Sequence, residues 1–419
     1  MRRIPEQTHE IHMVESSPRD QTQPKLITKQ YLKPGDRVAV SKPHLFDLEA
    51  GKEIRIDDKL FAEPWSIDRL EWEADSVRFT FLFNQRGHQV LRFLAVTAST
   101  GETKPVIDEV SKTFIDYSGK LYLHRTISNE IIWMSERDGW NHLYLIDAKS
   151  GSVKNRLTQG DWVVRGVDLV DERNRQIWFR AGGIAPEQDP YHIHFCRVDF
   201  DGKNLVRLTV GDGTHEIAYS PDKSTYIDTY SRIDLPPIHE LRRTSDGKLL
   251  AELERADWTA LVEAGWTKPE RFVAKGRDGK TDIYGAIFRP TRFDTNRTYP
   301  VIERIYAGPH SSFVPKKFSE WHGNLQTYAE LGFILVQIDG MGTSNRSKAF
   351  HDVCWKNLVD AGFPDRILWM KAAAAQFPTL DLTARGHLRR FGRRTERVGR
   401  VTDARRFLQG RRRGLRVSR

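Results

Sequence analysis

HLYLIDAKSGSVKNRL, residues 142–157, contains the pattern that decides the fold of most of this chain: an apolar strand, a turn with glycine, and a second strand. Alternating apolar residues around a Gly-containing loop are typical of a β-hairpin. The pattern recurs in HLFDLEAGKEIRI (44–56), VLRFLAVTASTGETKPVI (90–107), HIHFCRVDFDGKNLVRL (192–208) and, more weakly, IHELRRTSDGKLLAEL (238–253). The turn glycines are separated by 50, 50, 51 and 45 residues; they are Gly51, Gly101, Gly151, Gly202 and Gly247.

The period of these hairpins predicts an all-β propeller. Hairpins that repeat every ~40–50 residues are the sequence signature of four-stranded propeller blades. A β-sandwich is the alternative, but its turns would follow every ~8–12 residues without a longer period. We therefore expect residues 1–262 to form a partial propeller with four to five blades.

From about Trp266 the pattern changes to strands that alternate with helices, which is typical of a mostly parallel α/β sheet. We expect strands in FVAKG (272–276), IYGAIFRP (283–290), YPVIERIYAGPH (299–310) and FILVQIDGMG (333–342). Residues 318–332 are compatible with a helix, and a helix is expected within residues 365–377, where Leu, Trp and Ala recur at helical spacing. The second predicted domain covers residues 263–383.

Composition excludes several classes of protein. With 39% hydrophobic residues the chain is typical of a globular protein, and no apolar run approaches the ~20 residues of a membrane span. The N-terminus has no apolar signal-peptide region, and the compartment stays open. The only cysteines are Cys196 and Cys354, and no His, Cys and carboxylate cluster has metal-ligand spacing. We predict neither a metal nor a cofactor.

The last 36 residues differ from the rest. Residues 384–419 hold fourteen Arg, no Lys and two acids, a net charge of +12, whereas the whole chain carries +10. Residues 1–383 therefore carry −2, and the basic character belongs to the tail. Clustered Arg can bind phosphates in a salt-dependent manner, but the tail has no recognisable nucleic-acid-binding fold. We predict no specific nucleic-acid partner.

Upstream of the tail the chain resembles the dipeptidyl peptidase IV branch of the prolyl oligopeptidase family. The resemblance is carried by YPVIERIYAGPHSSF (299–313), LGFILVQIDGMGTSNRSKAFHD (331–352) and LVDAGFPDRILWMKAAAAQFPTLDLT (358–383), and upstream by ISNEIIWMSERDGWNHLYLID (127–147) with LTQGDWVVRGV (157–167). It implies a propeller followed by the N-terminal half of an α/β-hydrolase domain. The implied function is a serine exopeptidase that releases dipeptides, often X-Pro or X-Ala, from peptide N-termini.

The resemblance also implies which site residues to expect. Family members use a Ser in a Gly-x-Ser-x-Gly elbow after the next strand, then an Asp and a His. No Gly-x-Ser-x-Gly occurs in the 419 residues, and neither does the Glu-Glu pair with which the family binds the substrate amine. We expect these elements upstream of Met1 and beyond the end of the chain. Tyr306 matches the family residue whose hydroxyl donates into the oxyanion hole; packing at a strand end is its alternative role.

A shifted reading frame would explain the tail. If each codon took the last two bases of one tail codon and the first base of the next, RGHLRRFG (385–392) can encode Ala-Gly-Ile-Tyr-Gly-Gly-Ser-Ala, and the following residues Gly-Gly. The missing elbow then appears where the fold needs it. We therefore interpret residues 384–419 as a basic, out-of-frame, non-native tail. The DNA around codon 384 tests this hypothesis.

Other polar residues have simpler interpretations. His310 and His351 lack a nearby nucleophile, and Ser344 lacks flanking glycines, so we expect no catalytic role for them. Acidic residues at strand ends and helix starts are expected to cap turns and helices rather than to bind metal; they are Asp339, Asp352 and Asp365.

Two function hypotheses follow. In the first, the chain is a truncated dipeptidyl peptidase without peptidase activity, because the Ser-Asp-His triad is absent. Its family partners would be peptide substrates and a second copy in a homodimer, and its intact relatives are often exported. In the second, the propeller is a non-catalytic binding platform. An incomplete ring has unpaired strand edges, which favour aggregation over a defined interface.

Overall fold

The computed structural model describes residues 2–4, 7–319 and 322–389. Most of the predicted tail therefore lies outside the described residues. The chain forms two compact units, one of Met1–Ile115 with Ala148–Gly151 and the other of Asp116–Asp147 with the residues from Ser152 onward. The second unit contains three four-stranded antiparallel sheets as well as the five-stranded sheet of the α/β part. Because this unit has residues on both sides of position 262, the domain boundary predicted there stays a prediction.

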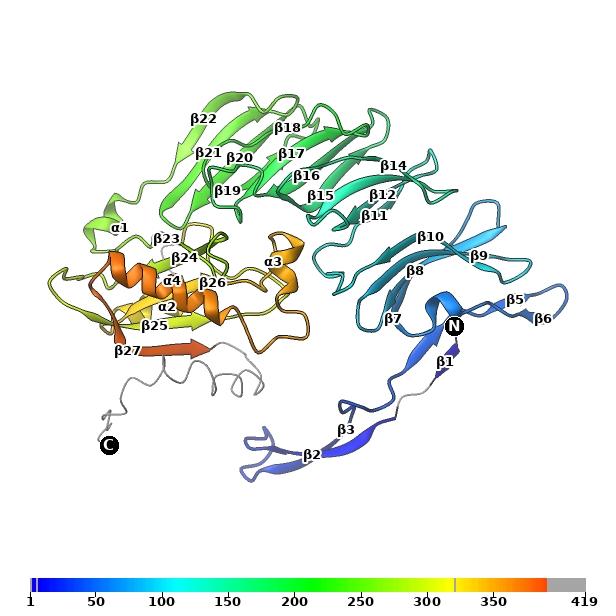
Figure 1. Cartoon of the computed structure of the whole chain (residues 1–419), viewed down its shortest axis with the longest axis horizontal. Coiled ribbons are helices and arrows are strands. Elements are labelled where there is room, and N and C mark those ends of the chain that lie inside the picture. Colours follow the sequence, from blue (N-terminus) through cyan, green and yellow to red (C-terminus); the bar gives the residue numbers. More distant parts are fainter. Residues whose placement is uncertain (1, 5–6, 320–321, 390–419) are drawn as a thin grey trace. The chain divides into compact units, whose positions relative to one another are not determined.

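The first unit consists of antiparallel strands (Figure 1). Its main sheet has the order β10-β9-β8-β7 and packs on a core that includes Phe61, Phe81 and Leu94. The main-sheet strands are β7 (Pro64–Trp72), β8 (Arg78–Gln85), β9 (Val90–Thr97) and β10 (Thr103–Val110). Three strand pairs precede this sheet: β1 (Arg2–Ile4) with β4 (Val40–Lys42), β2 (His9–Glu15) with β3 (Lys25–Tyr31), and β5 (Leu45–Asp47) with β6 (Lys52–Ile54). The short 3-10 helix η1 (Lys59–Phe61) lies between β6 and β7.

The second unit begins with three four-stranded antiparallel sheets, each with its strands in chain order. The first has β11 (Leu123–Arg125), β12 (Glu130–Ser135), β13 (His142–Asp147) and β14 (Val153–Arg156). The second has β15 (Val163–Asp171), β16 (Gln176–Gly182), β17 (Ile193–Asp199) and β18 (Val206–Arg207). The third has β19 (Thr214–Tyr219), β20 (Thr225–Arg232), β21 (Leu235–Arg243) and β22 (Leu249–Arg255). All five hairpins that the sequence predicts are present as paired strands.

The structure shows why glycine recurs in the turns of these hairpins. All five have positive φ, between 62° and 79°. A Cβ at Gly101 would lie 2.1 Å from the carbonyl oxygen of Arg55, and one at Gly202 would lie 2.4 Å from that of Arg156. Gly151 and Gly247 meet preceding backbone in the same way. Each of these four turns therefore packs on the preceding hairpin, where only glycine leaves room.

A five-stranded sheet follows, in the order β23-β24-β26-β25-β27. Its strands are β23 (Glu270–Lys275), β24 (Asp282–Phe288), β25 (Tyr299–Ile305), β26 (Ile334–Asp339) and β27 (Leu380–Arg389). The expectation of a mostly parallel sheet was wrong: β23–β24 and β24–β26 are antiparallel, and only β25–β26 and β25–β27 are parallel. The short turn between β23 and β24 forces an antiparallel pair, because parallel strands need a long crossover.

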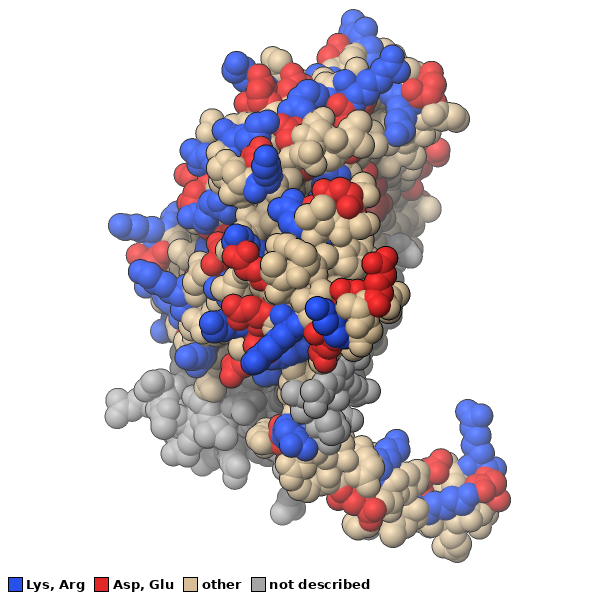
Figure 2. All heavy atoms as spheres, turned by 90° about the vertical axis from the view of Figure 1, so that its right-hand side faces the viewer, with Lys and Arg blue, Asp and Glu red and all other residues tan. Residues whose placement is uncertain are grey.

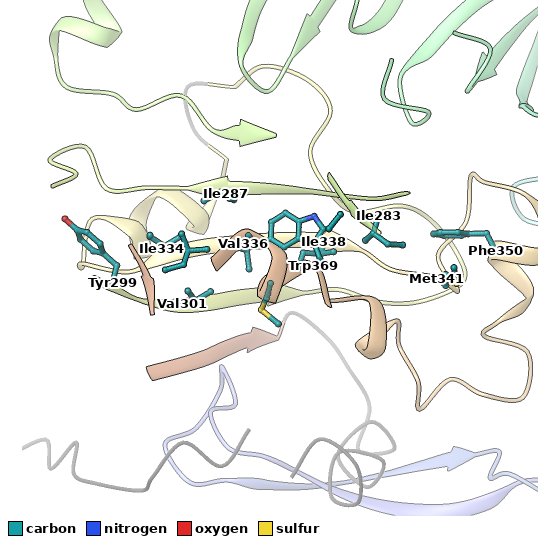
Figure 3. Packing of buried hydrophobic residues seen from close by; sticks show 14 residues of the cluster. Ile283, Ile287, Tyr299, Val301, Ile334, Val336, Ile338, Met341, Phe350 and Trp369 are labelled. Carbon is teal, nitrogen blue, oxygen red and sulfur yellow. The ribbon is translucent and has the colours of Figure 1, made fainter. Parts of the chain in front are cut away.

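The helices are short apart from the last one. They are α1 (Thr259–Glu263), α2 (Asn324–Ala329), α3 (Lys348–Asp352) and α4 (Phe363–Gln376). Among the helices of the described residues, none is both long and apolar enough to cross a membrane. Helix α4 packs on the five-stranded sheet through the buried Trp369 (Figure 3). The indole Nε1 of Trp369 donates a hydrogen bond to the carbonyl oxygen of Phe272. Gly285 in β24 permits this contact, because a Cβ there would lie 2.5 Å from the Trp369 ring.

Strand β27 crosses the predicted start of the tail. It pairs in parallel with β25 from Leu380 as far as Arg389, so residues 384–389 belong to the sheet. Parallel pairing uses backbone groups, which accounts for a strand in a segment of unusual composition. The sheet has five strands in the described residues and is not a complete α/β-hydrolase domain. Residues 390–419, the rest of the tail that we interpret as out of frame, lie outside the described residues.

Candidate functional site

Tyr306 is the first residue after β25, at the edge of the sheet where that strand ends. Its side chain is 40% exposed. The ring packs edge-on against Phe313, with centroids 4.4 Å apart and an interplanar angle of 63°. The phenol hydroxyl forms no hydrogen bond with any residue of the described ranges. The ring is therefore held in place while the hydroxyl stays free to donate.

The loop that carries Tyr306 and Phe313 is tied to the end of β26. The Asp339 carboxylate accepts hydrogen bonds from the backbone N–H groups of Phe313 (2.8 Å) and Val314 (3.0 Å). The Gln337 amide donates to the carbonyl oxygen of Phe313 over 2.7 Å. Burial raises the pKa of Asp339, although the two N–H donors oppose this shift. Asp339 thus holds a turn, as the sequence predicts, and is not arranged as a metal ligand.

The same loop has a second attachment, to the segment after β26. The Ser344 N–H donates to the carbonyl oxygen of Ser311 over 3.2 Å, and the Asn345 amide donates to the Ser312 hydroxyl over 3.0 Å. The buried Ser344 hydroxyl donates to Asp116. Ser344 is therefore a loop residue that contacts backbone, as the sequence predicts.

A third attachment comes from α3. The His351 imidazole is buried, and its Nε2 lies 2.6 Å from the carbonyl oxygen of Pro309. Its Nδ1 lies 3.2 Å from the ammonium nitrogen of Lys120. Burial first, and the Lys120 charge second, lower the pKa of His351 to about 4. His310, by contrast, is exposed. No sequence signal pointed to the contact with Lys120, which lies 231 residues away along the chain.

The remaining acidic candidates have structural partners. Asp365 near the start of α4 accepts hydrogen bonds from Arg277 and from the backbone N–H of Met341. Asp352 pairs with Lys348 one helical turn away. Within the described residues, no three His, Cys, Asp or Glu side chains are grouped so that they could hold a metal ion.

The comparisons with known proteins agree with this architecture. A model of the dipeptidyl peptidase IV N-terminal region matches residues 5–237, more than half of the chain. The chain belongs to the dipeptidyl peptidase IV family. A model of the prolyl oligopeptidase family also matches residues 318–386, which include β26, α3 and α4. The sheets that precede the site are therefore the β-propeller type of this family.

Individual relatives of the dipeptidyl peptidase IV family are distant. A probable dipeptidyl-aminopeptidase B of Tuber melanosporum is 29% identical over 212 residues, which are 49% of this chain and 23% of the relative. Dipeptidyl peptidase 8 of Mus musculus is 25% identical over 239 residues, 54% of this chain and 26% of the relative. The chain thus spans about a quarter of the length of these two relatives.

Solved structures extend the fold comparison over nearly the whole chain. The crystal structure of Porphyromonas gingivalis dipeptidyl peptidase 4 superimposes with a TM-score of 0.72 at 23% identity, covering 91% of this chain and 52% of that one. A putative dipeptidyl aminopeptidase IV from Bacteroides ovatus gives 0.71 at 21% identity, covering 91% and 55%. The fold is therefore that of dipeptidyl peptidase IV, over about half of each of these chains.

Proposed function

We propose that this chain is part of a serine exopeptidase that releases dipeptides, often X-Pro or X-Ala, from peptide N-termini. In this proposal Tyr306 donates its hydroxyl into the oxyanion hole. The exposed phenol, fixed by Phe313 and without a hydrogen-bond partner in the described residues, supports this role. A donor of this kind contributes about 3–4 kcal/mol to transition-state stabilisation.

The pairing of β25 with β27 carries the proposal. Ile305, the last residue of β25, is the register partner of Arg389, the last residue of β27. Parallel neighbours lie about 4.8 Å apart and end at the same edge of a sheet. Tyr306, the first residue after β25, therefore lies at the edge of the sheet where β27 also ends. The nucleophile elbow of this family follows that strand, so its serine would face the Tyr306 hydroxyl.

The proposal includes the inactivity of the chain with its present sequence. Hydrolysis needs a nucleophile with an adjacent base, and Tyr306 has no reaction to assist without them. Among the described candidates, the Ser344 hydroxyl is buried against Asp116 and both nitrogens of His351 are engaged. Neither can replace the missing serine and its base.

The distribution of charge on the displayed face does not favour nucleic-acid binding. Figure 2 shows Lys and Arg interspersed with Asp and Glu on the displayed face. Residues 1–383 together carry a net charge of −2. A nucleic-acid-binding surface would instead gather positive charge on one face or groove.

A chromogenic Gly-Pro substrate tests the proposal in two arms. The unrestored chain should show no turnover, and a serine-directed phosphonylating probe should label none of its residues. A chain whose frame is restored near codon 384, completed with the sequence that follows, should release the dipeptide. In that protein Tyr306→Phe should lower kcat about 10²–10³-fold, as the loss of one oxyanion donor does. Tyr31→Phe, which alters an exposed tyrosine of the first unit, is the matched control. Turnover by the unrestored chain, or full activity of Tyr306→Phe, would contradict the proposal.

A further inference from the structure

His351 is held in one tautomer by its two hydrogen-bond partners. The Pro309 carbonyl oxygen, 2.6 Å from Nε2, can only accept a hydrogen bond. The Lys120 ammonium, 3.2 Å from Nδ1, can only donate one. The imidazole must therefore carry its proton on Nε2 and present a lone pair at Nδ1. Both nitrogens are occupied, so His351 cannot also serve as a general base.

The Lys120 ammonium is itself fixed in place. Its Nζ lies 2.6 Å from a carboxylate oxygen of Glu136, and the two side chains are only 5% and 9% exposed. A buried charge of this kind is retained when a countercharge and further hydrogen bonds satisfy it. Lys120 and Glu136 belong to the propeller part of the chain, whereas His351 lies on α3, so a single chain of polar contacts joins the propeller to the loop of Tyr306.

Pro309 is three residues beyond Tyr306 in the same loop. Its ring fixes its own φ, so a hydrogen bond to its carbonyl oxygen restrains the backbone on both sides. The other two attachments of the loop lie further along, at residues 311–314. The His351 contact is therefore the nearest of these side-chain attachments to Tyr306.

We propose that His351 is a positioning residue for Tyr306, and that the ion pair of Lys120 with Glu136 sets the tautomer in which it acts. The catalytic significance rests on the function proposed above, in which Tyr306 donates to the oxyanion. An oxyanion donor must lie within about 2.7–3.1 Å of the developing charge, and a misplacement of about 1 Å can cost about 10²-fold in rate. A loop fixed at Pro309 keeps the Tyr306 hydroxyl within that tolerance.

The loop can be observed without turnover, which separates this proposal from the proposed activity. We would place 3-fluorotyrosine at position 306 of the full chain and record its ¹⁹F spectrum. Ring packing against Phe313 should give one resonance, displaced from that of free fluorotyrosine. His351→Ala should move this resonance toward the free value or broaden it. His351→Gln, whose amide can donate to Pro309 in place of Nε2, should restore most of the displacement.

His142→Ala is the matched control. His142 is as buried as His351, and its ring bonds to the Thr158 hydroxyl and, from Nε2, to the Gly160 carbonyl oxygen, away from the Tyr306 loop. This variant should leave the fluorotyrosine resonance in place. An unchanged resonance in His351→Ala, or an equal change in His142→Ala, would overturn the proposal.

The tautomer provides a test that needs no destabilising variant. In ¹⁵N-labelled full chain at pH 7, His351 should show a protonated Nε2 and an unprotonated Nδ1. The signal is assigned by its loss in His351→Gln. An imidazolium or an Nδ1–H tautomer would overturn the proposal, even if the chain proved to be an active peptidase. Conversely, the expected tautomer together with an inactive frame-restored enzyme would leave the positioning contact intact and remove only the proposed activity.

Discussion

Glu303 in β25 and Arg366 in α4 form an ion pair of 2.6 Å whose side chains are only 5% and 1% exposed. The Arg366 Nε also donates to the carbonyl oxygen of Ala361, just before α4. This pair fixes the helix to the strand that leads directly into Tyr306. The strand that leads to the candidate site is thus tied to α4 by a buried ion pair.

Removing one partner of this pair should therefore be costly. Glu303→Gln removes the ion-pair partner of the buried Arg366, and breaking such a pair costs about 3–5 kcal/mol. We expect a loss of that size in the free energy of unfolding, measured by urea denaturation of the full chain. Asp282→Asn, which breaks the exposed pair with Lys275, should cost less than about 1 kcal/mol. Equal losses in both variants would show that the buried pair contributes no more to the free energy of unfolding than the exposed one.

The turn glycines give a second prediction. Gly51 and Gly101 occupy the same place in successive hairpins, with φ of 62° and 72°, but only at Gly101 would a Cβ lie as close as 2.1 Å to a backbone carbonyl oxygen. Alanine at either site should cost about 1–2 kcal/mol for the left-handed backbone. Gly101→Ala should cost about 1–3 kcal/mol more, because the new Cβ collides with Arg55. Thermal unfolding of the two variants measures the difference, and equal melting temperatures would contradict the packing argument.

These glycines also show how far the sequence reaches. The hairpin repeat and the alternation of strands and helices are local patterns, and they predicted the strand pairs and the order of the two parts. The mixed direction of the five-stranded sheet could have been inferred from the short turn between β23 and β24. The contact of Lys120 with His351 could not, because it joins residues 231 positions apart and Lys120 lies in none of the segments that carry the family resemblance. Tyr306 could be named as a candidate from the sequence, whereas the hydrogen bonds that hold its loop are visible only in the structure.

Acid should destabilise the chain through its buried histidines. Burial lowers the pKa of His351 to about 4 and that of His194 to about 3, from an ordinary value of 6.5. Lys120 also lowers the pKa of His351, while Asp116 and Asp352 oppose it. Below pH 6.5 these histidines bind protons in the unfolded chain but not in the folded chain. Their contribution to the free energy of unfolding is therefore fully present above pH 6.5 and is lost as the pH drops toward 4.

Urea unfolding at several pH values checks this expectation. The free energy of unfolding of the parent chain should fall steadily between pH 6.5 and 4. His351→Gln has no titrating ring at this position and should lose less stability over the same interval. A parallel pH dependence in the parent and the variant would contradict a depressed pKa at His351.

Removal of the Lys120 charge should raise the pKa of His351. Lys120 is the second cause of the depression, after burial, so Lys120→Met should give a partial upward shift. The same variant frees Nδ1 and should allow the second tautomer to appear. A ¹⁵N titration of the ring measures both effects. Lys317→Met, which breaks the exposed contact with Glu216, is the control and should leave the His351 titration unchanged.

Tyr306→Phe should leave stability nearly unchanged, since its hydroxyl bonds to no residue in the described part of the chain and its ring is partly exposed. We expect a change in unfolding free energy of less than about 0.5 kcal/mol, as for an ordinary surface substitution. Tyr226→Phe is the matched comparison, because that buried hydroxyl donates to the Leu208 carbonyl oxygen over 2.6 Å. Its loss leaves a buried acceptor without a partner and should cost about 1–3 kcal/mol. If urea denaturation gave Tyr306→Phe the larger loss, the hydroxyl of Tyr306 would serve the fold, and its assignment as an oxyanion donor would lose its basis.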